Sequence, residues 1–400
     1  MIRATTLLIV TLCLDACGGS DSASATSDRA VAFQSDASHT GVSGILAPVF
    51  PQAAAWSRIF SGRLSYPLIA DGRVFVIESA DVANGFVPKL HALNRLSGVS
   101  AWVPVELPSQ RVGGGLAFEN GRVFVTTFEG EVLSIDAATG KLDWRMKLPD
   151  SFIFVSAPTA SGGFVYVGDG GGHRVVAIDE AHGTVAWTAT VQANTLGTPS
   201  VAADSVFVAA DCRYYGLVAS TGAERWHHDG VGCSGGVGAT LPVVQGRAYG
   251  RDFMPTAPIG PNIDVLDPTT GATLNRYTPA SPAEQGPIAA VTSTAVFLLD
   301  GGSLRRFDPL LSATRWSFAG DGTLSTPPLV VGAVVLVGGS SGTIYAVDGD
   351  TGSASWSARL PAGFDSPNDF GSVAPTGLAA GEGYLIVPAG ATLTAFRLTP

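Results

Sequence analysis

The sequence has few charged residues, and most of those it has are acidic. Asp, Glu, Lys and Arg make up 14% of the 400 residues, against roughly a quarter in average globular proteins. Lysine occurs only at positions 89, 141 and 147, and the formal net charge is −10. Because nucleic-acid binding depends on neutralising phosphates with Lys and Arg, this composition argues against a nucleic-acid partner.

Long helical patterns are also missing. Beyond the N-terminal segment, no apolar pattern with the spacing i, i+3, i+4, i+7 persists, so little helix is expected. Glycine is abundant by contrast, with 50 residues. Few charges and many glycines are typical of short buried strands joined by tight turns, and they predict an all-β protein.

The N-terminal segment has the features of a targeting sequence. Arg3 is followed by an apolar run at positions 7–14, which is too short to span a bilayer. The run ends in Leu14-Asp15-Ala16-Cys17, which resembles a bacterial lipobox with an unusual Asp15. This resemblance implies a lipoprotein signal peptide over residues 1–16, a lipid anchor on Cys17 and export across the inner membrane. Ordinary cleavage after Ala25 is the alternative.

Only four cysteines occur, and two of them lie in or next to the leader. The other two, Cys212 and Cys233, would reach an oxidising compartment, where a disulfide between them is expected. Two separate buried thiols are the alternative. By the register of the repeat described next, both belong to loops on the same face, within reach of a bridge.

The seven tryptophans lie on one series with spacings of about 40 to 46 residues and one double gap: Trp56, Trp102, Trp144, Trp187, Trp226, Trp316 and Trp356. The segments before them align, as in DAATGKLDW and DGDTGSASW, and Asn275 stands in the tryptophan position inside the double gap. Alternating strand signatures such as GRVFV (72–76 and 121–125) lie upstream. Four strands in each unit of about 43 residues are typical of a propeller blade.

Counting the units predicts an eight-bladed β-propeller over residues 56–400, built of four-stranded antiparallel blades. The last unit ends at Pro400, before its tryptophan turn, whereas Trp56 has no three strands before it. The segment from Trp56 to Phe60 is therefore expected to be the outer strand of the last blade and to close the ring. Residues 17–55, rich in Ser, Ala and Asp at first, are predicted to be a flexible tether.

The unit strand-Asp-x-x-Thr-Gly-x-x-x-Trp resembles the repeat of the pyrroloquinoline-quinone (PQQ) propeller family over residues 56–400. Two kinds of protein share this repeat. Quinoprotein dehydrogenases bind PQQ and calcium in the channel, whereas the BamB-like lipoprotein scaffold of the outer-membrane assembly machinery has no known chemistry. The repeat implies the fold, and function depends on the site.

The features that the resemblance would require of an enzyme are missing. The sequence has no adjacent cysteine pair and no CxxCH motif. The residues before the recurring proline, expected at one mouth of the channel, are small or apolar, as at Tyr66, Ala157, Thr198 and Leu241. Calcium needs six or more oxygen ligands. We therefore expect no cofactor, no metal and no catalytic residue; a PQQ-dependent or small-molecule enzyme is the alternative.

The long insertions all belong to loops on one face of the predicted propeller, where recognition is usual. Phe253, Met254 and Phe364 in these loops could be apolar anchors for a partner, or could fold back over the channel mouth. The sequence thus predicts a monomeric, lipid-anchored interaction scaffold of the cell envelope. It would lie on the periplasmic side of the outer membrane, if one exists, and bind protein partners.

Overall fold

The computed structural model describes residues 28–79, 87–109, 114–148, 155–169, 171–192, 195–210, 213–229, 238–252, 262–279, 288–365 and 375–398. Within these residues every regular element is a β-strand. No helix in them is long and apolar enough to span a membrane.

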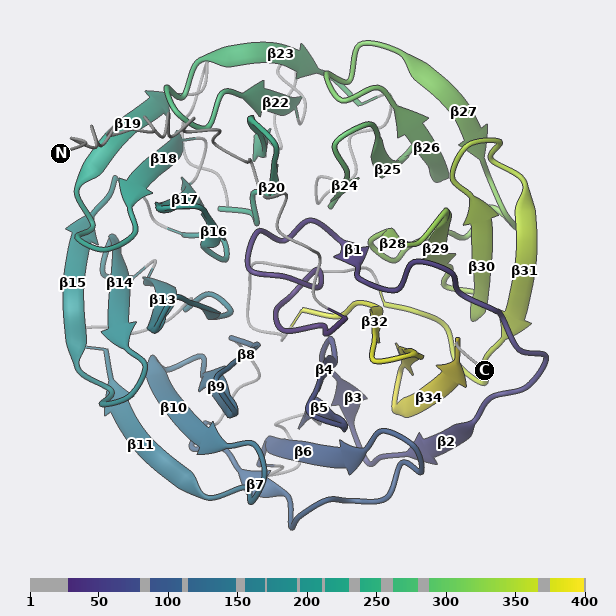
Figure 1. The fold of residues 1–400 in the computed structure, drawn as a ribbon, viewed down its shortest axis with the longest axis horizontal. Helices are drawn as coiled ribbons and strands as arrows, with labels where there is room; N and C mark the ends of the chain where they lie inside the picture. The colour runs from purple at the N-terminus through teal and green to yellow at the C-terminus, as the bar shows by residue number, and fades with distance from the viewer. Residues whose placement is uncertain are drawn as a thin grey trace, which may run out of the picture.

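The strands form eight sheets arranged as blades around a central axis (Figure 1). Listed from the axis outward, blades 1 to 4 consist of β4 (Leu68–Ala70), β5 (Arg73–Ser79), β6 (Lys89–Asn94) and β7 (Val105–Glu106); β8 (Leu116–Glu119), β9 (Arg122–Thr126), β10 (Glu131–Asp136) and β11 (Leu142–Lys147); β12 (Thr159–Ser161), β13 (Phe164–Asp169), β14 (Arg174–Asp179) and β15 (Val185–Thr190); and β16 (Ser200–Ala202), β17 (Ser205–Ala210), β18 (Arg213–Val218) and β19 (Glu224–Asp229).

Blades 5 to 8 follow the same plan. They consist of β20 (Val243–Val244), β21 (Arg247–Asp252), β22 (Asn262–Leu266) and β23 (Thr273–Tyr277); β24 (Ala290–Val291), β25 (Val296–Asp300), β26 (Ser303–Phe307) and β27 (Thr314–Phe318); β28 (Leu329–Val331), β29 (Val334–Gly338), β30 (Thr343–Asp348) and β31 (Ala354–Arg359); and β32 (Ala379–Gly381), β33 (Tyr384–Ala389), β34 (Thr392–Arg397) and β2 (Trp56–Ile59). Neighbouring strands of a blade are antiparallel, as predicted. The short strand β3 (Arg63–Leu64) also pairs with β5.

The burial of each strand follows from its place in the blade. Middle strands such as β9 are buried on both sides, with Val123, Phe124 and Val125 fully covered, because the blade is sandwiched between two others. Outer strands such as β11 alternate between exposed and half-buried side chains. Apolar runs in the middle and alternation outside are therefore the sequence pattern of each blade.

The tryptophans join each blade to the next one. The Trp144 Nε1–H donates to Glu180 O at 2.8 Å, and its ring covers the Cα of Gly183 in the turn of blade 3. A Cβ on Gly183 would lie 2.6 Å from that ring, and the residue also has a φ of +68°. Glycine is thus required twice at this position, for the backbone conformation and for the ring contact. The same pairing joins Trp56 to Gly98, Trp102 to Gly140, Trp187 to Gly222, Trp226 to Gly271 and Trp316 to Gly352.

Two junctions differ from this pairing. Trp356 of blade 7 donates to Pro51 O at 2.9 Å and stacks on Phe50, and the contact between blades 5 and 6 has no tryptophan. Asn275 replaces the tryptophan of blade 5, and its Nδ2 donates to Leu310 O at 2.6 Å. In the turn of blade 6, the residue with a left-handed backbone conformation is Leu311, with a φ of +57°. Leu311 is buried among Tyr249, Tyr277 and Phe307, so its side chain fills space where no indole is present.

The ring closes as the sequence predicts. Strand β2 pairs antiparallel with β34, from Trp56 opposite Ala395 to Ile59 opposite Thr392. Glu78 fixes the turn after β2, since its Oε1 accepts from the backbone N–H groups of Ser61 (2.7 Å) and Gly62 (3.2 Å) and its Oε2 bonds His91 Nε2 at 2.7 Å. Burial lowers the pKa of His91, and the hydrogen bond from Glu78 opposes that effect.

The prediction of a flexible tether up to residue 55 is wrong for residues 28–55. This part of the chain is packed onto the propeller: Ala30, Phe33 and His39 have no exposed surface, and β1 (Val42–Ser43) pairs in parallel with β28. The physical reason is that its backbone groups pair with the inner edges of the blades, which no composition reveals. Residues 17–27 lie outside the described part of the chain.

Candidate functional site

The centre of the propeller contains a segment of the chain itself, residues 28–43, here called the axial segment. Figure 1 shows it as the purple loop inside the ring of inner strands. It enters beside the β32–β33 turn, where Asp28 O accepts from Glu382 N at 2.6 Å, and beside the β4–β5 turn, where Arg29 lies 2.7 Å from Asp71. Both turns lie on the face that also carries the Thr-Gly turns, which we call the turn face. The opposite face, with the long insertions, is the loop face.

The axial segment bonds to the blades in ring order. Ala30 exchanges two backbone hydrogen bonds with Ile69 of blade 1, at 2.8 and 3.0 Å. Backbone N–H groups of the following inner strands then donate to it at 2.7–3.0 Å: Phe118 to Val31, Val201 to Ala37, Val243 to Ser38, Val291 to Thr40 and Val330 to Gly41. Blade 3 is reached through a side chain, His39. The segment therefore contacts all eight blades and closes the channel at the turn face.

His39 and Asp36 form the polar centre of this segment. The buried imidazole has Nδ1 2.6 Å from Phe33 O and Nε2 3.0 Å from both Thr159 Oγ1 and Pro199 O. The Asp36 carboxylate accepts from the backbone N–H of Thr40 at 3.0 Å and from the Thr40 hydroxyl. Burial raises the pKa of Asp36, while the bonds from Thr40 and the nearby His39 oppose the rise. The polar groups thus bind the segment to itself and to blades 3 and 4.

The backbone of the axial segment is held in uncommon conformations. Gln34, Ser35 and His39 have positive φ values of 55°, 78° and 54°. Such conformations cost of order 1 kcal/mol each in a non-glycine residue and persist where surrounding contacts fix them. Sequence reasoning missed this segment; Phe33 and His39, an aromatic and a histidine in a small polar stretch, were the available signal.

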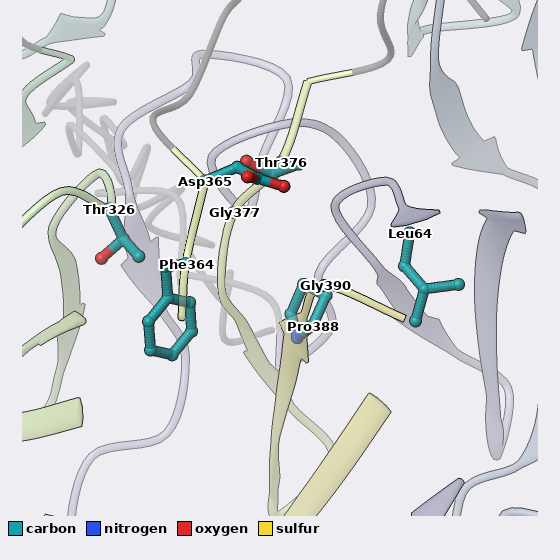
Figure 2. Close-up of a pocket in the computed structure, with 8 residues that line it drawn as sticks. All are labelled: Leu64, Thr326, Phe364, Asp365, Thr376, Gly377, Pro388 and Gly390. Carbon is teal, nitrogen blue, oxygen red and sulfur yellow. The ribbon is translucent and has the colours of Figure 1, made fainter. Parts of the chain in front are cut away.

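Of the predicted lipidation, disulfide and partner-binding residues, five lie outside the described part of the chain: Cys17, Cys212, Cys233, Phe253 and Met254. Phe364 is described and is 6% exposed, with its ring against Gly338. Its ring packs in an apolar cluster between blades 7 and 8. The choice between a partner contact and a cover over the channel mouth stays a prediction for Phe253 and Met254. Phe364 borders a cavity of about 10 Å³ together with Leu64, Thr326 and Asp365 (Figure 2). Such a space holds about one water molecule, too little for a substrate.

A second group of ionisable side chains lies between blades 2 and 3. Burial raises the pKa of Glu119 to about 7, and a hydrogen bond with Glu180 acts in the same direction. Glu119 accepts from the N–H groups of Gly162 and Gly163, and Glu180 pairs with Arg122 at 3.4 Å. Glu180 is buried and Glu119 is half-buried, and their contacts link neighbouring blades, which indicates a structural role.

Comparison with known proteins gives relatives of both kinds. The dehydrogenase subunit of the quinone alcohol dehydrogenase of Gluconacetobacter polyoxogenes is 29% identical over 194 residues, covering 43% of this chain and 25% of that protein. BamB of Yersinia pestis is 29% identical over 184 residues, covering 41% of this chain and 44% of that protein. The matches thus span less than half the length of either relative. The crystal structure of BamB from Moraxella catarrhalis has a TM-score of 0.63 at 19% identity, covering 88% of this chain and 100% of that one, which shows the shared fold.

The residues on the axis do not fit a quinone with its metal at the turn-face end of the channel. Phe33 packs against Tyr66 with ring centroids 5.1 Å apart, and a Cβ added to Gly41 would meet Ala290 Cβ at 3.0 Å. Among the described residues, no three His, Cys, Asp or Glu side chains are grouped so that they could hold a metal ion. We therefore derive no catalytic step through PQQ.

The family itself is shown by the repeats. The model of the PQQ-like family described as outer membrane protein assembly factor BamB matches residues 88–229, 154–256 and 259–399. These segments cover well over half of the 400 residues. The chain therefore belongs to this PQQ-like β-propeller family.

Proposed function

We propose that this protein is a non-catalytic interaction scaffold of the bacterial cell envelope. The observation that carries the proposal is the axial segment, which occupies the channel where a propeller enzyme of this family would need space for its cofactor. His39 and Phe33 have no exposed surface there. A propeller sealed by its own chain is suited to presenting loops on a rigid frame.

The envelope location rests on the leader and on the BamB relatives. Cys17 is proposed to carry a lipid anchor after export, with the propeller on the periplasmic side of the outer membrane. The Cys17→Ala variant should leave the membrane fraction or remain unprocessed. A mature variant that stays in the membrane fraction would favour cleavage after Ala25 and contradict the anchor.

Protein partners are proposed to bind the loop face. Phe253 and Met254 remain candidates for that contact, whereas the buried side chain of Phe364 is unavailable to a partner without rearrangement. BamB of Yersinia pestis is named an outer membrane protein assembly factor. By this precedent, depletion of the protein should lower the amount of folded outer-membrane β-barrel proteins, measured by heat-modifiable mobility on gels. Unchanged levels in a strain with less than a tenth of the protein would contradict this role.

The competing function is a quinone-dependent dehydrogenase, which the similarity to the alcohol dehydrogenase subunit favours. Purified protein incubated with PQQ and calcium should show no bound chromophore after gel filtration and no dye-linked alcohol oxidation. Stoichiometric retention of PQQ with turnover would establish the enzyme and overturn the scaffold.

A further inference from the structure

Two uncharged stretches of the chain meet on the turn face, between blades 8 and 1. Residues 37–57 and residues 96–105 contain no Asp, Glu, Lys or Arg. They meet at Trp56, whose Nε1–H donates to Arg95 O at 2.8 Å and whose ring packs on Gly98.

These stretches expose large apolar side chains. The exposed fractions are 82% for Leu46, 59% for Val49, 61% for Leu96, 64% for Val99 and 85% for Val103. Leu96, Val99 and Val103 lie within one segment between β6 and β7 of blade 1, and we call these three residues the apolar edge. Leu46 and Val49 lie elsewhere on the turn face, where Leu46 O is next to Gly332 of blade 7 and the Val49 N–H donates to Leu398 O of blade 8. Elsewhere among the described residues, exposed large apolar side chains in the turn regions are single residues, such as Leu142 and Val185. Single exposed apolar residues are normal, whereas a group of them marks an interaction surface.

The start of the described chain lies at the margin of the apolar edge. Asp28 bonds to Glu382, and Glu382 bonds to Arg95, with Arg95 Nε 3.1 Å from its Oε2. Arg95 directly precedes Leu96. Eleven residues separate Asp28 from Cys17, so an anchor there lies within about 40 Å of this margin even with the chain fully extended. Residues 18–27 are Gly, Ser, Ala, Thr and one Asp, which are too polar to cover an apolar surface.

We propose that the apolar edge docks onto a lipid bilayer, so that the turn face is held toward the membrane and the loop face points away from it. The proposal rests on the envelope location and anchor proposed above. A single acyl chain gives only marginal membrane binding, and a second contact makes it stable. Docking through apolar side chains does not require anionic lipid, so zwitterionic vesicles should be sufficient to bind the protein.

The test uses the chain from residue 17 carrying Cys17→Ala, which has no acyl group, so that its result is independent of lipidation. In co-sedimentation, phosphatidylcholine vesicles should bind the protein, and added salt should not release it, because the contact is apolar. Leu96→Ser with Val103→Ser should lower the partition coefficient about tenfold or more, because each loses an apolar side chain from the bilayer. The matched control, Leu142→Ser with Val185→Ser, changes exposed apolar residues of blades 2 and 3 and should bind like the parent.

Three outcomes would overturn the proposal. One is that the protein, at micromolar concentration, does not bind phosphatidylcholine vesicles at millimolar lipid. Another is equal loss in the test and control variants, which would mean unspecific adhesion. The third is a dimer in light scattering that the test variant alone converts to monomer, since a second copy would then cover the apolar edge. Failure of the Cys17→Ala fractionation alone would contradict the anchor and leave the vesicle result standing.

Discussion

Replacing His39 with alanine should destabilise the propeller more than any surface change, because this one side chain joins the axial segment to blades 3 and 4. The substitution removes the hydrogen bonds at Nδ1 and Nε2 and leaves Phe33 O without its partner. Pro199 O keeps the hydroxyl of Thr159, which donates to it at 2.6 Å. A lost hydrogen bond costs about 1 kcal/mol, and a buried carbonyl left unpaired costs about 1–3 kcal/mol.

The space left by the imidazole adds a cavity to this loss, since His39 is completely buried. We therefore expect the free energy of unfolding to fall by about 3–5 kcal/mol. Urea unfolding followed by tryptophan fluorescence measures it. His182→Ala is the control: that side chain is 76% exposed and bonds Asp179 within its own turn, so its loss should change stability by less than about 0.5 kcal/mol.

Hydrogen exchange locates the effect. The amides of Val201, Val243, Val291 and Val330 donate to the axial segment. In the His39→Ala variant they should exchange faster, while amides between the middle strands of the same blades keep their protection. If the variant unfolds within 1 kcal/mol of the parent and these four amides keep their rates, the axial segment does not depend on His39, and the reasoning fails.

Three further predictions test other parts of the molecule. Gly183→Ala should lower the free energy of unfolding in urea by about 2–4 kcal/mol, because the added Cβ meets a tryptophan ring. Gly162→Ala, at a similar φ of +65° and with no atom within 4 Å of the added Cβ, should lower it by only about 1 kcal/mol. Equal losses in the two variants would contradict the ring contact. Because burial raises the pKa of Glu119 to about 7, its neutral form is favoured in the folded protein, so stability should fall as pH rises from about 4.5 through 7; Glu119→Gln should flatten this slope, and an unchanged slope would assign it elsewhere. A non-reduced digest of periplasmically expressed protein should contain one peptide pair linked through Cys212 and Cys233, whereas two freely alkylated thiols would contradict the disulfide.

The blades could be predicted from the sequence because particular side chains are required at particular positions of each blade. A tryptophan that packs on a turn needs a glycine in that turn, and both residues appear in the sequence at fixed spacing, as at Trp144 and Gly183. Where the tryptophan is missing, the glycine is missing too: Asn275 stands in the tryptophan position of blade 5, and in the facing turn of blade 6 the residue with positive φ is Leu311. The closing strand could be predicted for the same reason, because Trp56 stands in the position of an outer-strand tryptophan although the three inner strands of its blade do not precede it in the sequence.

The axial segment could not be predicted in this way. Most of its contacts to the blades are backbone hydrogen bonds, from Ala30 to Gly41, and any residue supplies those groups equally well. Its positive φ values at Gln34, Ser35 and His39 require no glycine because tertiary contacts fix them. A short stretch rich in Ser and Ala therefore resembles a tether in sequence, although it is buried in the structure.

The axial segment also explains how one fold can serve two kinds of function. In a propeller, the innermost strand of each blade has no neighbouring strand on its channel side, so its N–H and C=O groups that face the channel must find water, a ligand or another part of the chain. A channel that binds a cofactor has to keep that space open. Here residues 28–43 accept a hydrogen bond from an inner-strand N–H group in each of blades 1, 2 and 4 to 7, and they contact blade 3 through His39 and blade 8 at Glu382. The same N-terminal arm continues into β2, which closes the rim. Since both closures come from one continuous arm, opening the channel for a ligand would also release the contacts that hold the ring at its axis. A rigid scaffold gains from that coupling, whereas an enzyme with a channel site would lose its site to it.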